Sequence, residues 1–166
     1  MYIRQAQVDD VQVLGEIHAL TWKHAYKGIV PDSVLDQTTA EKRQLYFKKA
    51  LTEKWEEDYL IFYREQPAGL ICIGKCRDQD MSSDVGEIWG IYILPAFQGK
   101  GVGTYSIKWA LEELKSRGYT KVTLWVLEEN LHARRFYEYK GFQYKGMFKE
   151  IQLGKTLIEL RYEKEM

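Results

Sequence analysis

The segment from Val85 to Leu127 constrains the fold of this chain more than any other. Val85–Leu94 is an apolar run that predicts a strand, Gly101–Arg117 has the apolar periodicity of a helix, and Lys121–Leu127 predicts a second strand. Strand, helix and strand in this order form a right-handed parallel crossover. The loop between the first strand and the helix is therefore expected at the carboxyl end of the sheet, where such sheets bind ligands.

That loop is rich in glycine and predicts an anion site. Gly99, Gly101 and Gly103 alternate within it, and glycines expose backbone N–H groups without side-chain obstruction. The positive dipole end of the following helix adds to this effect, so we expect a diphosphate as the ligand. A Walker loop is excluded because no lysine and hydroxyl pair follows the last glycine. The dinucleotide pattern GxGxxG also fails, because it would require glycine at Thr104 or Ser106.

The rest of the chain predicts a mixed α/β architecture. Helical periodicity precedes Gly28 and recurs from Thr39 to about Leu51, whereas Asp58–Tyr63 and Ala68–Cys76 are apolar runs typical of strands. Between them, Glu65-Gln66-Pro67 has the composition of a hairpin turn. A first strand at residues 1–6, a helix at Asn130–Lys140 and two final strands, near Phe142–Ile151 and Thr156–Glu163, complete a mixed sheet with helices on its faces.

Size and charge limit the classes of function. A chain of 166 residues favours one domain, spanning residues 1–166, that buries roughly 70% of its unfolded-chain surface. The 24 basic and 24 acidic residues balance, so no overall field attracts nucleic acid or an anionic membrane. No apolar run approaches the ~18 residues of a membrane span, and Met1 enters a strand pattern at once without a signal-peptide core. We therefore expect a cytoplasmic protein.

Cysteine and histidine spacing predicts neither a disulfide nor a metal. Cys72 and Cys76 are placed in one predicted strand, roughly 13 Å apart, which is too far for a bond between them. Metal binding would need two more ligands nearby, and the three histidines show no ligand spacing. Buried, reduced thiols and no metal are the expectation.

Two motifs together resemble the GNAT superfamily of N-acetyltransferases. The first is QxxGxG, from Gln98 to Gly103, and the second is NxxAxxFYxxxGF, from Asn130 to Phe142. The resemblance implies an acyl-CoA N-acyltransferase fold: a mixed, mostly antiparallel twisted sheet of about seven strands, with helices on both faces and a central parallel crossover. It also implies that acetyl-CoA is the cosubstrate and that the protein is an acyltransferase.

The resemblance further implies which residues bind the cofactor. Gly90 lies inside the predicted strand, where glycine often marks a bulge that leaves backbone amides unpaired. By resemblance these amides grip the pantetheine arm and polarise the thioester carbonyl; the alternative is that Gly90 only makes room for Trp89 or Trp125. Asn130 is either a helix cap alone or also a ligand of that arm. The predicted cofactor residues are Ile91, Tyr92, Ile93, Gln98, Gly99, Lys100, Gly101, Val102, Gly103, Thr104, Asn130, Ala133 and Tyr137.

Two side chains are candidates for proton transfer. Glu87, near the start of the strand before the loop, is the candidate base, acting directly or through water, and it lies where many resembling enzymes carry an acid. Its alternative is a half-exposed strand carboxylate. Tyr137 is the candidate acid for the leaving thiolate, because a phenol stays protonated at neutral pH. The alternative for Tyr137 is a packing role.

The acceptor is the least specified part. Trp22 and Tyr26 lie one helical turn apart where resembling proteins form a wall of the acceptor pocket, and with Glu87 they are the predicted substrate residues, unless they are aromatic core. Asp78, Asp80 and Asp84 either attract an amine or form a solvated loop, and Arg134 and Arg135 either meet phosphate or are solvated. A small-molecule amine or a peptide N-terminus would be the partner, with a homodimer as one arrangement. The rival interpretation is a CoA-binding sensor without catalysis.

Overall fold

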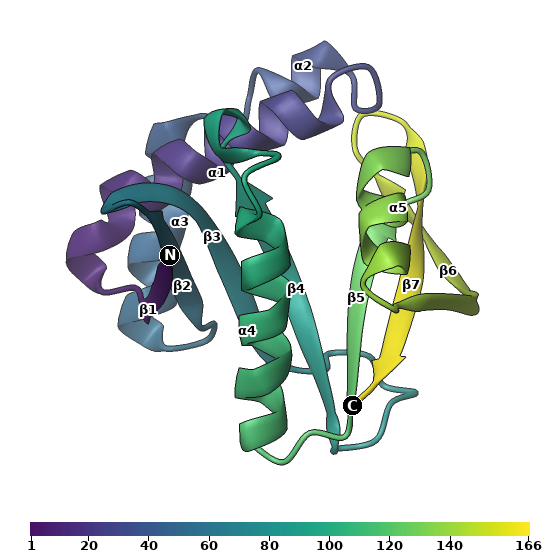
Figure 1. The fold of residues 1–166 in the computed structure, drawn as a ribbon. Helices are drawn as coiled ribbons and strands as arrows, with labels where there is room; N and C mark the ends of the chain where they lie inside the picture. Colours follow the sequence, from purple (N-terminus) through teal and green to yellow (C-terminus); the bar gives the residue numbers. More distant parts are fainter.

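A computed structural model describes residues 1–166 as one seven-stranded sheet covered by helices (Figure 1). The strands are β1 (Tyr2–Gln5), β2 (Asp58–Tyr63), β3 (Gln66–Lys75), β4 (Val85–Ile93), β5 (Lys121–Leu127), β6 (Gln143–Gln152) and β7 (Thr156–Glu165). The helices are α1 (Val11–Tyr26), α2 (Asp32–Leu35), α3 (Ala40–Glu53), α4 (Val102–Ser116) and α5 (Leu131–Tyr139), with short 3-10 turns at Val8–Asp10 and Pro95–Phe97.

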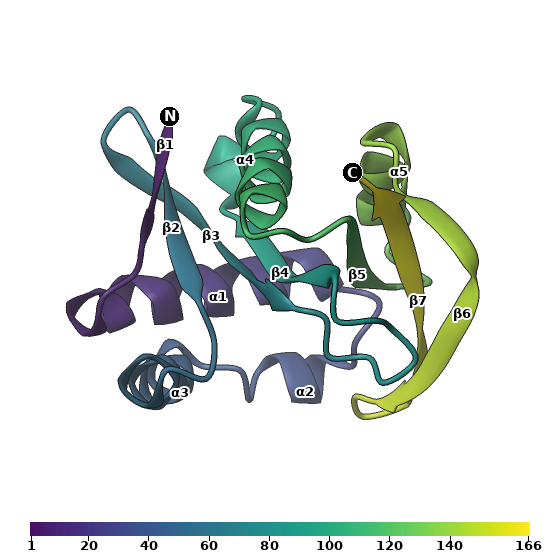
Figure 2. The same ribbon diagram turned by 90° about the horizontal axis from the view of Figure 1, so that it is seen from below.

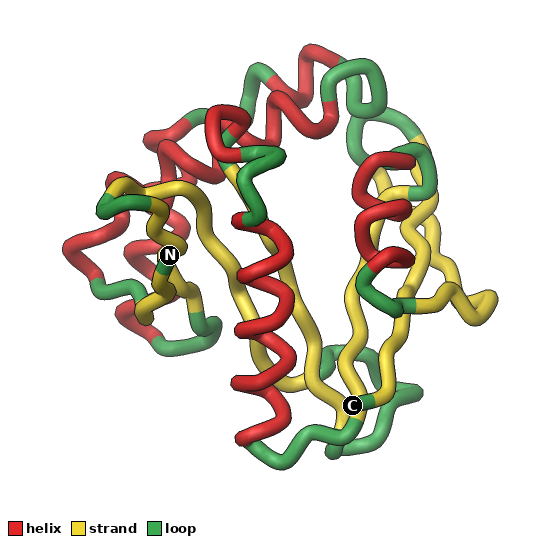
Figure 3. Tube along the Cα trace, viewed as in Figure 1, coloured by secondary structure: helices red, strands yellow, loops and turns green.

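The sheet order is β1-β2-β3-β4-β5-β7-β6, and every neighbouring pair is antiparallel except β4 and β5. The predicted fold class is confirmed: a mixed, mostly antiparallel sheet with one central parallel crossover through α4. Helices α4 and α5 lie on one face and α1, α2 and α3 on the other (Figure 2). The tube in Figure 3 shows how the loops gather at the two ends of the strands.

Each face of the sheet buries its own apolar cluster. On the α4 side, Ile107, Ala110 and Leu114 pack on strand residues such as Val122 and Leu124. On the α1 and α3 side, the smaller cluster includes Leu14, Phe47, Leu60 and Leu70. The two-sided cover explains why β2 and β3 are apolar at almost every position rather than at alternate ones.

The β2–β3 hairpin turns one residue earlier than its composition predicts. The turn consists of Arg64 and Glu65, both with left-handed backbone (φ 47° and 64°), and β3 already begins at Gln66. Pro67 lies inside β3, beside a register shift between Ile61 and Phe62. Proline is tolerated at such an irregularity because the ladder hydrogen bond is already interrupted there.

Both cysteines are free and buried, as predicted, although only Cys72 lies in a strand. Cys76 follows the last residue of β3, and its sulfur lies 3.4 Å from the Thr123 hydroxyl. No helix is both long and apolar enough to cross a membrane.

Candidate functional site

Strands β4 and β5 separate soon after they begin. Their parallel pairing covers only Val85–Glu87 against 121–123, and beyond Glu87 the strands diverge (Figure 1). The far half of β4 pairs with β3 on one side only. The backbone edge of β4 that carries Ile91, Tyr92 and Ile93 therefore faces a gap in the sheet without a partner strand.

A bulge in β4 lies at the start of this gap, as Gly90 predicts. Cys72 pairs with Gly90 and Ile73 with Ile88, so Trp89 is the extra residue. A β-carbon on Gly90 would lie 2.7 Å from a ring carbon of Tyr92 and 3.1 Å from its hydroxyl oxygen. Gly90 thus makes room for Tyr92, whose ring folds back over the bulge.

The glycine loop connects the end of β4 to α4. Gly99 and Gly101 have positive φ (74° and 80°), and a β-carbon on either would meet no atom within 4 Å. Gly101 directly precedes α4, and no side chain caps the first turn of that helix. The amides of this turn are therefore free for a ligand. Gly103 has a different role, because its β-carbon would lie 3.1 Å from the Phe136 ring of α5.

Helix α5 carries the second motif along the other side of the gap. The Asn130 side chain accepts a hydrogen bond from the Ala133 amide at 3.2 Å, which confirms the predicted helix cap. The Tyr137 ring packs against Phe142, and burial, with a smaller contribution from Tyr92, raises the pKa of its phenol. The acid candidate therefore keeps its proton throughout the neutral range.

Arg134 is not a solvated helix residue. Its guanidinium donates to the Tyr162 hydroxyl at 3.1 Å and to the Glu128 carbonyl at 2.9 Å. It therefore ties α5 to β7 and to the end of β5. Arg135 is exposed, which agrees with its solvated alternative. Lys100 in the glycine loop is also exposed, with its ammonium 5.4 Å from the Phe97 ring centroid.

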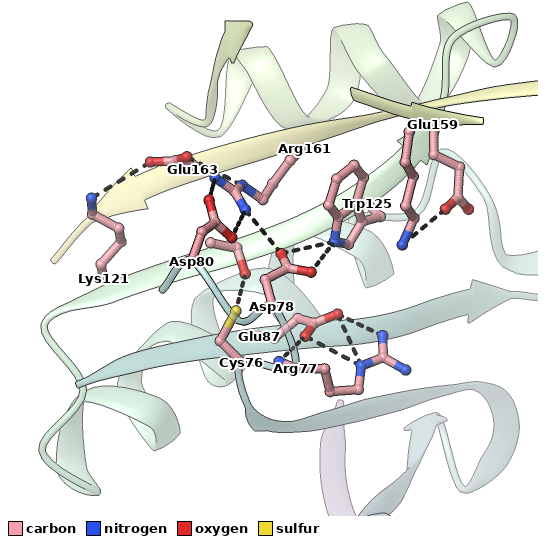
Figure 4. Close-up of polar contacts among 12 residues, drawn as sticks. Cys76, Arg77, Asp78, Asp80, Glu87, Lys121, Trp125, Glu159, Arg161 and Glu163 are labelled. Atoms are coloured by element: carbon pink, nitrogen blue, oxygen red, sulfur yellow. Dashed lines mark hydrogen bonds and ion pairs between the residues drawn. The ribbon is translucent and has the colours of Figure 1, made fainter. Parts of the chain in front are cut away.

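Glu87 is buried and paired rather than half-exposed. Only 1% of the residue is exposed, and its carboxylate accepts hydrogen bonds from the Arg77 backbone amide at 2.9 Å and from the Arg77 guanidinium (Figure 4). The Arg77 guanidinium in turn lies 4.2 Å from the centroid of the Trp89 ring. Arg77 thus donates to both oxygens of the Glu87 carboxylate.

The aspartates after β3 bind an arginine from β7. Asp78 and Asp80 form ion pairs with Arg161 at 3.2 and 2.8 Å, and the Trp125 indole donates to Asp78 at 3.1 Å (Figure 4). Both acids are therefore paired within the chain rather than free to attract an amine, and Asp80 is also exposed, as the solvated alternative holds. Asp84 accepts from Thr120 at 2.6 Å and from Ser82. These contacts link the β3–β4 loop to β5 and β7.

A cavity opens on the α1 and α3 face, directly behind the bulge. Its inner chamber has a volume of about 110 Å³ and its outer chamber about 540 Å³. Four residues line both, so the two chambers are adjacent: His18, Arg43, Tyr46 and Tyr92. The inner chamber adds Phe47, Glu56, Asp58, Leu70, Cys72, Arg77, Trp89 and Gly90, and the outer chamber adds Trp22, Gln37, Thr38 and Lys42.

Of the three predicted substrate residues, only one lines this cavity. Trp22 lines the outer chamber, whereas Tyr26 packs edge-on against Trp22 with ring centroids 5.2 Å apart and is not a lining residue. Glu87 lies behind Arg77, which is itself a lining residue.

The inner chamber contains one buried acid, Asp58, and one half-buried acid, Glu56, which the sequence motifs do not include. Asp58 is 1% exposed, and its Oδ2 atom has no hydrogen-bond partner. Burial and the neighbouring Glu56 raise the pKa of Asp58 to about 8. The only sequence signal is an aspartate at the head of the apolar run 58–63, where an unpaired acid is costly.

Glu56, Asp58 and Cys72 place their ligand atoms within 4.8 Å of one another. Burial raises the pKa of both Asp58 and Cys72, so these two groups retain their protons at neutral pH. A divalent cation would have to displace both protons, which weakens this cluster as a metal site.

His18 makes the stability of the fold dependent on pH. Burial, together with the charge of Arg43, lowers its pKa to about 3, and its Nδ1 atom has no partner. Below the unfolded-state pKa of about 6.5 the unfolded chain takes up a proton that the folded chain refuses, so the stabilising contribution is complete above that value and is lost as pH falls toward 3. We expect His18 to lower the free energy of unfolding by about 2–3 kcal/mol between about pH 7 and pH 4.

Chemical denaturation of wild type and His18→Leu across this pH range checks the prediction. The quantity to compare is the difference in the free energy of unfolding between the two proteins at each pH. This difference is needed because Asp58, with its raised pKa, stabilises the fold as pH falls and so opposes the effect of His18 in both proteins. A difference that stays constant with pH would contradict a buried, neutral His18.

The fold and the sequence identify the class of protein. A sheet that splays at a central parallel pair, with a glycine loop leading into the crossover helix, is the architecture of N-acyltransferases that use acyl-CoA. The PaiA N-acetyltransferase of Thermoplasma acidophilum, solved in complex with coenzyme A, superposes with a TM-score of 0.76 at 20% identity, covering 99% of this chain and 98% of that chain. Residues 17–142 match the profile of the acetyltransferase (GNAT) family, and the chain belongs to this family.

Two curated relatives match most of the chain. An uncharacterized N-acetyltransferase of Bacillus subtilis, YuaI, is 24% identical over 166 residues, 92% of this chain and 91% of its own. A spermidine N(1)-acetyltransferase of Thermoplasma acidophilum is 22% identical over 149 residues, 85% of this chain and 87% of its own. The resemblance to N-acetyltransferases is thereby confirmed, and the protein is an acetyltransferase.

Proposed function

We propose that the glycine loop binds the diphosphate of acetyl-CoA and that the protein transfers the acetyl group directly to a primary amine of a small molecule or peptide. One observation carries the proposal: the uncapped first turn of α4 and its glycines lie beside the gap in the sheet, with a cavity on the opposite face. The pantetheine arm would pass between β4 and α5 along Ile91–Ile93 and Asn130. One N-acetyltransferase domain then spans residues 1–166.

The chemistry requires one proton acceptor and one proton donor. An alkylamine with a pKa near 10.4 is neutral in only about one molecule in 2,500 at pH 7, a cost of roughly 4.6 kcal/mol. The ammonium first loses one proton, and the neutral nitrogen then attacks the thioester carbonyl carbon. The C–N bond forms and the nitrogen loses a second proton, the C–S bond breaks, and the thiolate takes one proton to leave as CoA thiol, so that one proton is released overall. We assign the amine proton to Glu87, reached through water past Arg77, and the thiolate proton to Tyr137.

Tyr137→Phe is expected to lower kcat about 100-fold, because the leaving thiolate loses its proton donor while the ring still packs on Phe142. The affinity for acetyl-CoA should remain within about threefold, since the diphosphate is held by the loop. The matched control is Tyr139→Phe on the same helix, whose tyrosine is 84% exposed. Full turnover by Tyr137→Phe in a thiol-release assay would remove the acid role and leave the binding loop untouched.

Free-thiol release with acetyl-CoA and a panel of primary amines tests the function as a whole. Release that depends on an added amine, with a mass gain of one acetyl group on that amine, is the expected result. Tight binding of CoA without release across the panel would instead favour a sensor that holds the cofactor and does not catalyse transfer.

A further inference from the structure

The two chambers behind the bulge differ in charge. The outer chamber contains two cationic side chains, Lys42 and Arg43, and no carboxylate. The inner chamber shares Arg43 and adds Arg77, which is bound to Glu87, and it also contains the carboxyl groups of Glu56 and Asp58 beside Gly90. A molecule that fills both chambers therefore meets carboxyl groups only in the inner chamber, next to the gap in the sheet, and cations without a carboxylate in the outer one.

Arg43 is a guanidinium without an ionic partner. It lies on the Tyr46 ring, with its central carbon 4.1 Å from the ring centroid, and 5.0 Å from that of Phe47. It forms none of the ion pairs of the chain, and its Nε atom is buried without a hydrogen-bond partner. The other arginine of the cavity, Arg77, is in contrast bound to Glu87. A guanidinium that lies over aromatic rings and has no ionic partner can present its N–H edge to a planar, two-oxygen acceptor such as a carboxylate.

The inner end of the cavity requires a cationic donor rather than an anion. The Asp58 Oδ2 atom is buried and unpartnered, and Glu56 has a single bond, at 2.6 Å from the Tyr46 hydroxyl. An ammonium group can donate to both groups, to the Glu56 carboxyl and to the unpartnered Oδ2 atom of the protonated Asp58, and Trp89 and Tyr92 also line this part of the cavity. The inner end is also the end nearest the bulge, where the amine of an acceptor must arrive.

On the basis of the proposed acetyl transfer, we infer that the acceptor is an amine that also carries a carboxylate, with its carboxylate on Arg43 and its amine between Asp58 and Gly90. A polyamine fits less well, because its second ammonium would lie between Lys42 and Arg43 with no acid to balance it. We therefore expect this chain to prefer a different acceptor from the one named in its relative, the spermidine N(1)-acetyltransferase.

The experiment compares acceptors that differ only in the distal group. Straight-chain amino carboxylates and α-amino acids are assayed for thiol release against diamines and monoamines of the same chain length. Amino carboxylates should exceed the matched diamines at least ~10-fold in kcat/KM. Arg43→Gln should lower kcat/KM for amino carboxylates at least ~10-fold more than it lowers kcat/KM for monoamines of the same chain length. Arg43→Lys, which keeps the charge but not the two-pronged edge, should give an intermediate loss.

Lys48→Gln is the matched control, because it removes one positive charge from the same helix at an exposed side chain outside the cavity. Diamines that equal or exceed amino carboxylates, or an unchanged preference in Arg43→Gln, would overturn the inference while leaving acetyl transfer intact. Absence of thiol release with every amine would instead overturn the proposed function. In that case calorimetric titration of amino carboxylates into the CoA-loaded protein decides the inference: binding lost in Arg43→Gln supports it, and no binding overturns it.

Discussion

Glu87→Gln should lower kcat at least ~100-fold near neutral pH, because a general base contributes a factor of this order. The loss should be greatest at low pH, where the acceptor amine is most fully protonated and its deprotonation is hardest. The substitution keeps the size of the side chain, and the amide oxygen still accepts from Arg77, so the fold should persist. Steady-state thiol release from about pH 6 to pH 9 measures the effect.

If the role of Glu87 were only structural, Glu87→Gln would lower stability without lowering turnover. Glu163→Gln is the matched control, since Glu163 is also a buried acid (7% exposed) that is ion-paired, here with Lys121 and Arg161, on a strand outside the gap. Both variants should lose about 1–3 kcal/mol of stability, and only Glu87→Gln should lose turnover. A pH–rate curve for Glu87→Gln that matches the wild type would leave Glu87 as the partner of Arg77 and nothing more.

Gly101→Asp should weaken acetyl-CoA binding about 100-fold relative to Gly101→Asn. Both side chains tolerate the left-handed backbone at φ 80°, and both find open space, so they differ mainly in one negative charge. A unit charge about 4 Å from another is worth up to ~4 kcal/mol near a protein surface, and the diphosphate is expected within that range. Calorimetric titration of both variants gives the ratio of dissociation constants.

The opposite end of α4 provides the control. Gly118 also has positive φ (90°) and open space around it, but it lies past the C-terminus of the helix. Gly118→Asp and Gly118→Asn should bind acetyl-CoA equally well. Equal dissociation constants for the Asp and Asn variants at position 101 as well would place the diphosphate elsewhere.

The parts of the fold that the sequence predicted are those in which local residues decide the structure. The glycines before α4, the cap at Asn130 and the bulge at Gly90 are each fixed by backbone conformations or hydrogen bonds within a few residues. The hairpin was misplaced for the same reason. Arg64 and Glu65 adopt left-handed backbone without being the Asn or Gly that normally signals it, so only the pairing of β2 with β3 imposes their conformation.

Of the cavity behind the bulge only Trp22 could be predicted, because the other groups come from separate elements. His18 lies on α1, Arg43 on α3 and Asp58 on β2, and no spacing rule connects them. The aspartates after β3 illustrate the same limit. Asp78 and Asp80 have the composition of a solvated loop, and only the arrival of Arg161 on β7 converts them into ion pairs.

The most direct test of the whole account is a calorimetric titration of acetyl-CoA into the folded wild-type protein at two temperatures. Two temperatures are needed because the heat of binding can pass through zero at one of them. We predict one saturable acetyl-CoA site per chain in the wild type, with a Kd between about 1 µM and 1 mM, and loss of this binding in Gly101→Asp. No heat at either temperature would contradict the claim that main-chain amides at the start of α4 hold the cofactor.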